Sequence, residues 1–335
     1  MMNKSTNMLF MLIMLMSVPI AISSNSWFSI WMSMEINMMA FIPMIMEQKN
    51  MMSKEATLTY FLIQTIASML MMLSFIMMTI NKNNLNQMGE MMLMSSLMIK
   101  SGMFPFHFWL PKMMEGLNWN KCLILMTWQK IIPLMTMSYI ISINLLTLMT
   151  MIMSITIGAM GGLNQTSIRK LMAYSSITNN GWMMSAMLLS EYMWIIYFIF
   201  YSMMTYIMTS TMNTYNIMHM NQIMSMNESI KMKLMLLINM LSISGLPPMM
   251  GFMPKWLIIQ IAMSMKELML LGTMIIMTLI TVYYYLRIIF STMMLSNMEP
   301  KWIYKFTNKN KSNMMIMSTM TIMGLMMITM TNMMY

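Results

Sequence analysis

Long apolar segments separated by short polar joints run along almost the whole chain. A helix that spans a bilayer needs about 20 mostly apolar residues, and lipid offers no partner for unpaired backbone groups, so such segments must be helical. The sequence therefore predicts an all-α, polytopic membrane protein with about eleven transmembrane helices. We place them at about 7–23, 27–46, 56–80, 91–111, 121–143, 147–164, 171–190, 193–213, 234–263, 268–290 and 313–333.

The composition agrees with a membrane protein. Hydrophobic residues make up 59% of the 335 residues, charged residues only 8%, and the mean hydropathy is +0.64. A soluble domain carries about a quarter charged residues, so the composition excludes a soluble globular enzyme and a disordered chain. Methionine supplies 71 residues, scattered through the apolar segments. We interpret it as a replacement for leucine and isoleucine rather than as a copper site.

Few side chains could hold a cofactor or a metal. The chain has one cysteine, Cys122, two histidines, His107 and His219, and no aspartate. These residues cannot form a disulfide framework or a four-cysteine cluster, and the glycines follow no dinucleotide or Walker A pattern. We therefore expect no cofactor and no metal in this chain. The net charge of +10 lacks the interleaved aromatic residues of a nucleic-acid-binding module, so we expect no nucleic acid partner.

Basic residues fall mainly on one side of the predicted membrane. If the N-terminus faces the positive-inside compartment, fourteen of the nineteen basic residues, Lys231 and Lys233 among them, lie in joints on that side, and only Lys82 and Lys266 lie on the other. This segregation follows the positive-inside rule and favours eleven spans with termini on opposite sides. The first segment resembles a signal peptide, but a second span follows it at once, which favours a retained helix.

Four charged residues lie inside predicted spans: Glu35, Lys100, Lys130 and Lys255. A charge at the bilayer centre costs about 2.5–3.5 kcal/mol, so four cost on the order of 10 kcal/mol. Such residues persist when they pair, line water or carry protons. There are two alternatives. The lysines could lie near helix ends that are placed wrongly here and reach the membrane surface with their long side chains, or Glu35 and a lysine could form a purely structural pair. Neither alternative accounts for all four residues.

Two segments, 101–112 and 244–255, share the pattern S-G-x-x-P-x-x-x-x-x-P-K. Proline removes a backbone donor and glycine loosens a helix, so each segment predicts a broken or kinked helix. Paired broken helices in the two halves of a transporter indicate an internal repeat with ion sites at the breaks. We therefore predict one transmembrane domain over 1–335, with repeat one at about 7–143, repeat two at about 147–290 and a terminal helix at about 313–333.

Five motifs surround these residues. They are WMSMEIN at 31–37, KSGMFPFHFWLP at 100–111, TWQK at 127–130, GGLNQTSIRKLMAYSSI at 161–177 and GLPPMMGFMPKW at 245–256. They closely resemble the subunit 2 family of mitochondrial NADH:ubiquinone oxidoreductase, respiratory complex I, and the resemblance extends over nearly the whole chain. The stretch at 161–177 separates this family from the related antiporter-like subunits 4 and 5.

The resemblance implies a core membrane subunit of a proton-pumping NADH:ubiquinone oxidoreductase. Its place would be the inner mitochondrial membrane, with the N-terminus on the matrix side and the C-terminus on the intermembrane-space side. The fold would be an antiporter-like inverted repeat that lacks the first three of fourteen helices. Partners would be the lipid bilayer and other membrane subunits of complex I, including the antiporter-like ones. NADH, FMN, iron–sulfur clusters and ubiquinone would bind in other subunits.

The resemblance also implies roles for the charged residues inside the spans. Glu35 matches the carboxylate of a Glu–Lys pair and Lys100 its lysine partner. Lys130 matches a central relay lysine, and Lys255 matches the terminal proton-handling lysine on the second broken helix. His107 could join an entry path, or it could be a hydrogen-bonded histidine beside the break.

One departure from the family is visible at Asn179, where the family commonly has histidine. A mechanism that needs an imidazole there does not apply to this chain, unless water substitutes. Two other functions compete with the proton-pumping subunit. The chain could be a stand-alone cation/proton antiporter subunit of the same fold, or a passive scaffold that retains ancestral lysines.

Overall fold

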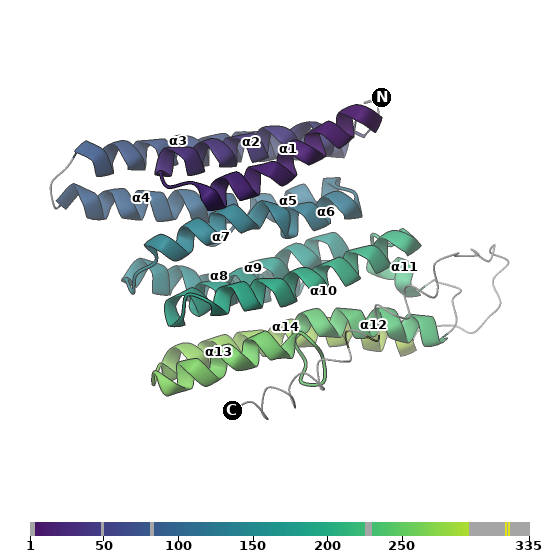
Figure 1. Cartoon of the computed structure of the whole chain (residues 1–335). Coiled ribbons are helices and arrows are strands. Elements are labelled where there is room, and N and C mark those ends of the chain that lie inside the picture. The colour runs from purple at the N-terminus through teal and green to yellow at the C-terminus, as the bar shows by residue number, and fades with distance from the viewer. Residues whose placement is uncertain are drawn as a thin grey trace. The chain divides into compact units, whose positions relative to one another are not determined.

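A computed structural model describes residues 4–47, 50–80, 84–224, 230–294, 319 and 321. Helices dominate this part of the chain, and no strand occurs in it beyond an isolated β-bridge between Ser167 and His219. The helices are labelled in Figure 1. Their bounds are α1 Lys4–Ser23, α2 Trp27–Ile45, α3 Met51–Ile80, α4 Asn84–Ser101, α5 Trp109–Gly116, α6 Trp119–Met126, α7 Trp128–Ile140, α8 Leu145–Gly162, α9 Ile168–Leu189, α10 Met193–Tyr215, α11 Met220–Met224, α12 Ile230–Ser244, α13 Phe252–Ser264 and α14 Leu268–Met294.

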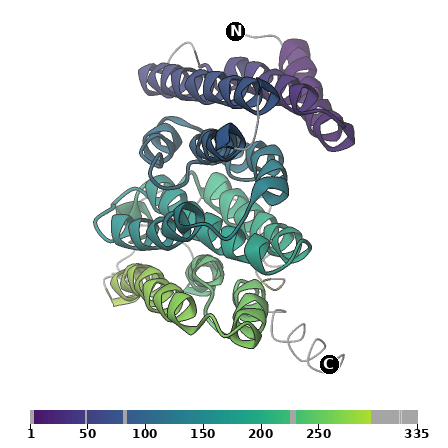
Figure 2. The same cartoon turned by 90° about the vertical axis from the view of Figure 1, so that its left-hand side faces the viewer.

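The chain divides into two compact units, Met1–Thr147 and Leu148–Tyr335. In the first unit, α1 packs on α2, α3 packs on α4 and α5, and α4 packs on α7. In the second unit, α10 packs on α9 and α12, α12 packs on α14, and α13 packs on α9. Within each unit the long helices run roughly side by side (Figure 2). The division into one domain of two repeats stays a prediction.

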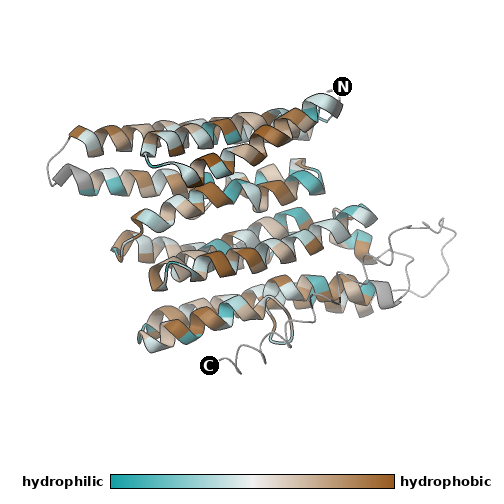
Figure 3. Ribbon diagram, viewed as in Figure 1, coloured by the Kyte–Doolittle hydropathy of each residue, from teal (hydrophilic) through white to brown (hydrophobic). Residues whose placement is uncertain are grey.

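Seven helices in the described part of the chain are long and apolar enough to cross a membrane. Apolar residues extend along the length of these helices (Figure 3), and many large ones are exposed, as lipid contact requires. The predicted all-α, multi-pass membrane architecture is therefore confirmed. The predicted terminal span at 313–333 lies outside the described residues except for Thr319 and Thr321, so the count of eleven spans stays a prediction.

The two predicted helix breaks are present. Seven residues separate α4 from α5, and seven separate α12 from α13. Each break begins with a glycine in the left-handed region, Gly102 at φ 72° and Gly245 at φ 82°. Only glycine adopts this conformation without a steric penalty, which explains the glycine of the shared sequence pattern.

A third interruption occurs where the sequence predicts one continuous helix at 121–143. The segment is split at Thr127, which has φ −111° and ψ −74° and separates α6 from α7. The Thr127 hydroxyl donates to the Leu123 carbonyl at 2.8 Å, and the Thr127 amide donates to the same oxygen at 3.0 Å. Threonine that bonds back to the preceding turn often bends a helix, but Thr136 and Thr209 make the same bond inside the continuous helices α7 and α10, so this bond alone does not account for the interruption.

Candidate functional site

The break after α4 keeps its backbone groups satisfied. The Gly102 amide donates to the Ile99 carbonyl at 3.3 Å, and the Met103 amide donates to the Met98 carbonyl at 3.0 Å. These two bonds form a Schellman motif. The indole nitrogen of Trp109, the first residue of α5, also donates to the Ile99 carbonyl at 3.1 Å. The helix can therefore end at membrane depth without leaving these carbonyls unpaired.

Lys100 lies in the last turn of α4, just before this break, and is buried. The negative end of the helix dipole stabilises a cation at this position. Its ammonium lies 3.3 Å from the Met34 sulfur of α2, and it forms no ion pair within 4.0 Å with the neighbouring Glu35. The Glu35–Lys100 pair of the sequence analysis therefore stays a prediction, although the structure places Lys100 against the residue next to Glu35.

Glu35 is half-buried at the border between the exposed and the buried face of α2, close enough to Lys100 and Tyr60 to interact with both electrostatically. On the exposed side, Met32 and Met39 lie one turn away and are 46% and 55% exposed, and the next residue, Ile36, is 39% exposed. The opposite face, with Met34 and its buried neighbours, packs into the first unit. A carboxylate on the outer face of a membrane helix is costly if only acyl chains cover it.

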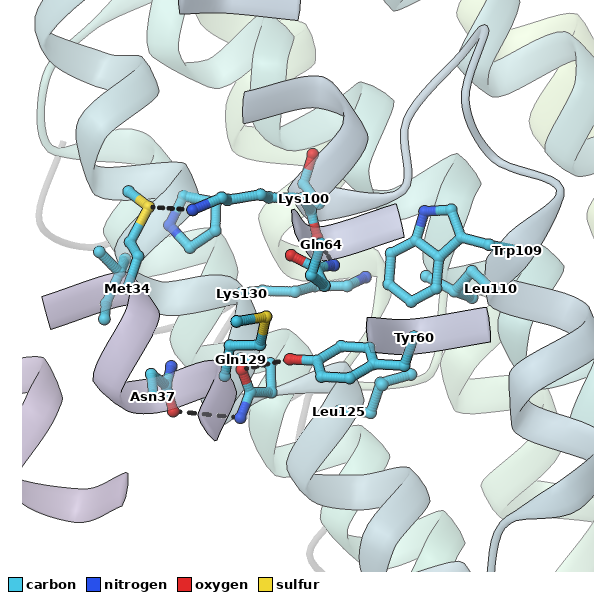
Figure 4. A pocket seen from close by; sticks show the side chains of 14 residues that line it. Met34, Asn37, Tyr60, Gln64, Lys100, Trp109, Leu110, Leu125, Gln129 and Lys130 are labelled. Atoms are coloured by element: carbon cyan, nitrogen blue, oxygen red, sulfur yellow. Dashed lines mark hydrogen bonds between the residues drawn. The ribbon is translucent and has the colours of Figure 1, made fainter. Parts of the chain in front are cut away.

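Lys130 lies in the first turn of α7, three residues after the interruption at Thr127. It is 2% exposed. Lys130 and Lys100 line one cavity in the first unit, together with Gln64 of α3 (Figure 4). The cavity has about 20 Å³ of room for water. A buried water needs roughly 10–15 Å³, so the cavity has room for at least one.

Polar side chains from three helices meet beside these lysines (Figure 4). The Tyr60 hydroxyl of α3 donates to Gln129 Oε1 at 3.2 Å, and Gln129 Nε2 donates to Asn37 Oδ1 of α2 at 3.1 Å. Gln64 Nε2 donates to the Lys100 carbonyl at 3.4 Å. All of these residues line the same cavity.

His107 lies in the seven-residue break after α4 and is buried. Its ring stacks at a tilt on Phe108, with centroids 4.1 Å apart. Its Nδ1 atom is buried without a hydrogen-bond partner among the described residues, and His107 does not line the cavity that holds Lys100 and Lys130. Its place on an entry path stays a prediction.

Lys255 lies in the second unit, in the first turn of α13, and is buried. Its ammonium donates to the Ser244 carbonyl at 2.8 Å. This carbonyl belongs to the last residue of α12, so the lysine occupies the negative end of the first half of its broken helix. The ammonium also lies 6.0 Å from the ring centroid of Trp182, within reach of a cation–π interaction.

Asn179 of α9 is buried near the middle of the second unit. The Tyr197 hydroxyl donates to Asn179 Oδ1 at 2.8 Å. Asn179 Nδ2 and Trp182 Nε1, one turn further along α9, are buried donors without a partner among the described residues. Buried polar groups are almost always hydrogen-bonded, often to ordered water.

The structure brings Lys100 and Lys130 into one cavity and places Lys255 in the other unit. Four polar residues of that cavity were not predicted from the sequence: Asn37, Tyr60, Gln64 and Gln129. The sequence did contain a hint of them, because amide side chains are rare inside apolar spans. Asn37 lies two residues after Glu35, and Gln129 directly precedes Lys130.

The sequence predicted Lys233 in a joint between two spans. That assignment is wrong, since Lys233 lies in α12 and is 8% exposed.

Discontinuous helices with buried ionisable groups at their breaks define a multi-pass membrane protein of the transporter type. The family model described as "NADH:quinone oxidoreductase/Mrp antiporter, TM" matches residues 24–281. NADH-ubiquinone oxidoreductase chain 2 of Anopheles gambiae is 44% identical over 337 residues, which cover 98% of each chain. The chain belongs to the family of NADH-ubiquinone oxidoreductase chain 2, as its motifs predicted.

Two solved structures share the fold. A chain of respiratory complex I from Thermus thermophilus matches with a TM-score of 0.83 and 19% identity, over 96% of this chain and 78% of that one. A chain of the Mrp complex from Dietzia sp. DQ12-45-1b matches with a TM-score of 0.80 and 12% identity, over 94% of this chain and 74% of that one. Both bacterial chains are longer than this one.

Proposed function

We propose that this chain translocates protons as a core membrane subunit of NADH:ubiquinone oxidoreductase in the inner mitochondrial membrane. Its N-terminus would face the matrix and its C-terminus the intermembrane space. Glu35, Lys100, Lys130 and Lys255 would handle the protons. Electron transfer from NADH to ubiquinone through FMN and iron–sulfur clusters would take place in other subunits and drive this chain.

The observation that carries this proposal is the shared cavity of Lys100 and Lys130. Burying one lysine at membrane depth costs about 2.5–3.5 kcal/mol, and two in one cavity also repel each other when both are charged. Two such residues side by side are costly for a scaffold. A relay uses them, because a proton on one lysine disfavours a proton on the other and so promotes its onward transfer.

Glu35 supplies a means of loading the relay. Two unit charges 4 Å apart interact by about 4 kcal/mol at an effective dielectric constant of 20. Moving one charge against 100 mV requires about 2.3 kcal/mol. Opening and closing a Glu35–Lys100 pair therefore has the magnitude needed to load and release a proton against the membrane potential. The contact of Lys100 with Met34 would be the open arrangement.

The position of Glu35 supports a partner subunit. Its carboxylate lies at the border of the exposed apolar face of α2, close enough to Lys100 and Tyr60 for electrostatic interaction. Another membrane subunit of complex I, packed on the exposed face of α2, would cover the apolar side chains beside it. This is also the position from which a neighbouring subunit can influence the first charged residue of the relay.

Replacing Lys130 with methionine in the assembled complex tests the proposal. Methionine keeps much of the volume and removes the charge, so we expect normal assembly and a reduced ratio of protons pumped to NADH oxidised in proteoliposomes. Lys112→Met is the matched control, because Lys112 is exposed in α5. An assembled Lys130→Met complex that pumps at the parent ratio would refute the relay.

A stand-alone cation/proton antiporter subunit is the second candidate, supported by the likeness to the Mrp complex chain. Its test is sodium-dependent proton exchange by the purified chain alone in liposomes. Exchange that requires no other subunit would favour this function. A passive scaffold predicts instead that methionine variants of all three buried lysines keep the parent pumping ratio.

A further inference from the structure

The ammonium of Lys100 has an unusual acceptor, the sulfur of Met34. Lys100 Nζ donates to Met34 Sδ at 3.3 Å (Figure 4), and among the described residues this sulfur is its one hydrogen-bond partner. An ammonium has three N–H donors, and a thioether is a weak acceptor. Two donors therefore remain for water or for another side chain, and the one bond that the ammonium makes is a weak one.

A second acceptor lies on the next residue of α2. Glu35 interacts with Lys100 electrostatically, but the described residues contain no ion pair between them within 4.0 Å. Successive side chains on a helix point about 100° apart, so Met34 lies on the buried face of α2 and Glu35 at its border. Lysine has a flexible four-carbon stem. Its ammonium can therefore change between two neighbouring acceptors by rotating its own bonds, without movement of a helix.

The two acceptors bind an ammonium with different strength. The thioether of Met34 is neutral, whereas the carboxylate of Glu35 carries a full charge and accepts the stronger, charge-assisted hydrogen bond. The negative end of the α4 dipole stabilises the Lys100 ammonium in either arrangement. Without the sulfur, the ammonium would have no acceptor beside residue 34, and a buried donor without an acceptor is costly. Loss of the sulfur would therefore drive the ammonium toward Glu35.

Met38 shows that the contact depends on one position rather than on methionine in general. Met38 lies one turn after Met34 on α2 and lines the same cavity. It is equally buried, with 4% exposure against 5% for Met34. Its sulfur nevertheless takes part in no hydrogen bond within the described part of the chain. The contact with Lys100 therefore belongs to Met34, and Met38 is a matched control.

We propose that Met34 is a positioning residue that keeps the Glu35–Lys100 pair open. The inference rests on the proposed function and adds to it the acceptor that competes with Glu35 for the ammonium. The sulfur takes up no proton. It accepts a hydrogen bond from the ammonium while the pair is open and loses that bond when the ammonium moves to Glu35. Because the bond is weak, both arrangements stay accessible.

Met34→Leu in the assembled complex removes the sulfur and nearly conserves the volume of the side chain. One weak hydrogen bond corresponds to about a two- to tenfold change in an equilibrium constant, so the closed pair should be favoured by that factor. We expect the rate of proton pumping per assembled complex to fall by about two- to tenfold, with the KM for NADH at the parent value. Met38→Leu makes the same exchange on the same helix and should pump at the parent rate.

Met34→Gln distinguishes positioning from packing. Glutamine is nearly as long as methionine, and its amide oxygen can replace the sulfur as a neutral acceptor. A positioning role predicts that Met34→Gln pumps faster than Met34→Leu. A merely structural role predicts the reverse order, because a buried amide fits an apolar site less well than leucine does. That reverse order, or a Met34→Leu complex that pumps like Met38→Leu, would overturn the inference.

Lys100→Met separates failure of this inference from failure of the proposed function. If Lys100→Met stops pumping while Met34→Leu matches Met38→Leu, Lys100 is functional and the sulfur does not position it. If Lys100→Met pumps at the parent rate, the proposed role of Lys100 is refuted and the inference with it. Density maps of the parent and the Met34→Leu complexes give a direct check. An ammonium that moves into ion-pair distance of Glu35 supports the inference, and one that keeps its place contradicts it.

Discussion

Gly245→Ala is expected to displace the ammonium of Lys255 without touching the lysine itself. A Cβ atom added at Gly245 would lie 2.9 Å from Lys255 Nζ and 3.1 Å from its Cδ. The side chain is flexible, so it can move away at little steric cost. Moving breaks the 2.8 Å bond to the Ser244 carbonyl, because that carbonyl belongs to the residue just before Gly245.

The expected loss of stability in Gly245→Ala is the sum of two contributions. Gly245 has φ 82°, and a left-handed conformation costs a residue with a Cβ atom about 1–2 kcal/mol. A hydrogen bond from a charged donor contributes about 1.5–3 kcal/mol. We therefore expect Gly245→Ala to destabilise the break by about 2.5–5 kcal/mol in total. The first contribution is the backbone strain at residue 245. The second is the loss of the hydrogen bond between Lys255 and Ser244, which also displaces the ammonium.

Gly102→Ala and Gly272→Ala separate these two contributions. Gly102 has nearly the same φ, 72°, but its added Cβ would meet the Leu110 methyl at 2.8 Å rather than an ammonium. At Gly272 nothing lies within 4 Å of the added atom. The thermal inactivation midpoint should fall for Gly245→Ala and Gly102→Ala but not for Gly272→Ala, since Gly272 lies inside α14, where alanine favours the helix.

Proton pumping per assembled complex then tests the function of Lys255. We expect Gly245→Ala to pump nearly as poorly as Lys255→Met, because in both the ammonium is missing from its place at the end of α12. Gly102→Ala should pump better than either. An assembled Gly245→Ala complex that pumps at the parent rate would refute the idea that the Ser244 contact positions a functional charge.

Three further variants probe two other polar contacts. Glu35→Gln and Lys100→Met should give the same loss of pumping, because each leaves the other charge without its partner, and clearly different phenotypes would argue against a pair. Tyr197→Phe should lower the thermal inactivation midpoint, because the buried Asn179 oxygen loses its donor at a cost of about 1–3 kcal/mol. The exposed Tyr206→Phe is its control, and equal midpoints would contradict that estimate.

The membrane architecture could be predicted from the sequence because its cause is local. An apolar run of membrane length has to be a helix wherever it lies in the fold. The breaks after Ser101 and Ser244 were predictable for the same reason, since a left-handed glycine followed by prolines ends a helix without help from distant residues. The same local logic identified Lys130 and Lys255 as charges at membrane depth.

What could not be predicted depends on residues that meet only in the fold. Thr127 lies at an interruption, but Thr136 and Thr209 make the same side-chain bond inside continuous helices, so the threonine itself does not predict a break. Tyr60 and Gln129 are 69 positions apart, and their hydrogen bond exists because α3 and α7 line the same cavity. Lys233 resembles a loop residue beside Lys231, and only packing buries it.

The helix interruptions explain how this chain buries lysines with so few carboxylates. A continuous helix offers no free carbonyl in its middle, because each is already bonded to the next turn. A break frees carbonyls at membrane depth, and Lys255 uses one of them, at Ser244, as its acceptor. Lys100 and Lys130 likewise lie within three residues of an interruption. An ammonium held by a carbonyl can be released more readily than one held by a carboxylate, because no opposite charge is left behind unpaired. A carbonyl at an interruption therefore suits Lys255, which under the proposed relay would gain and lose a proton in each cycle.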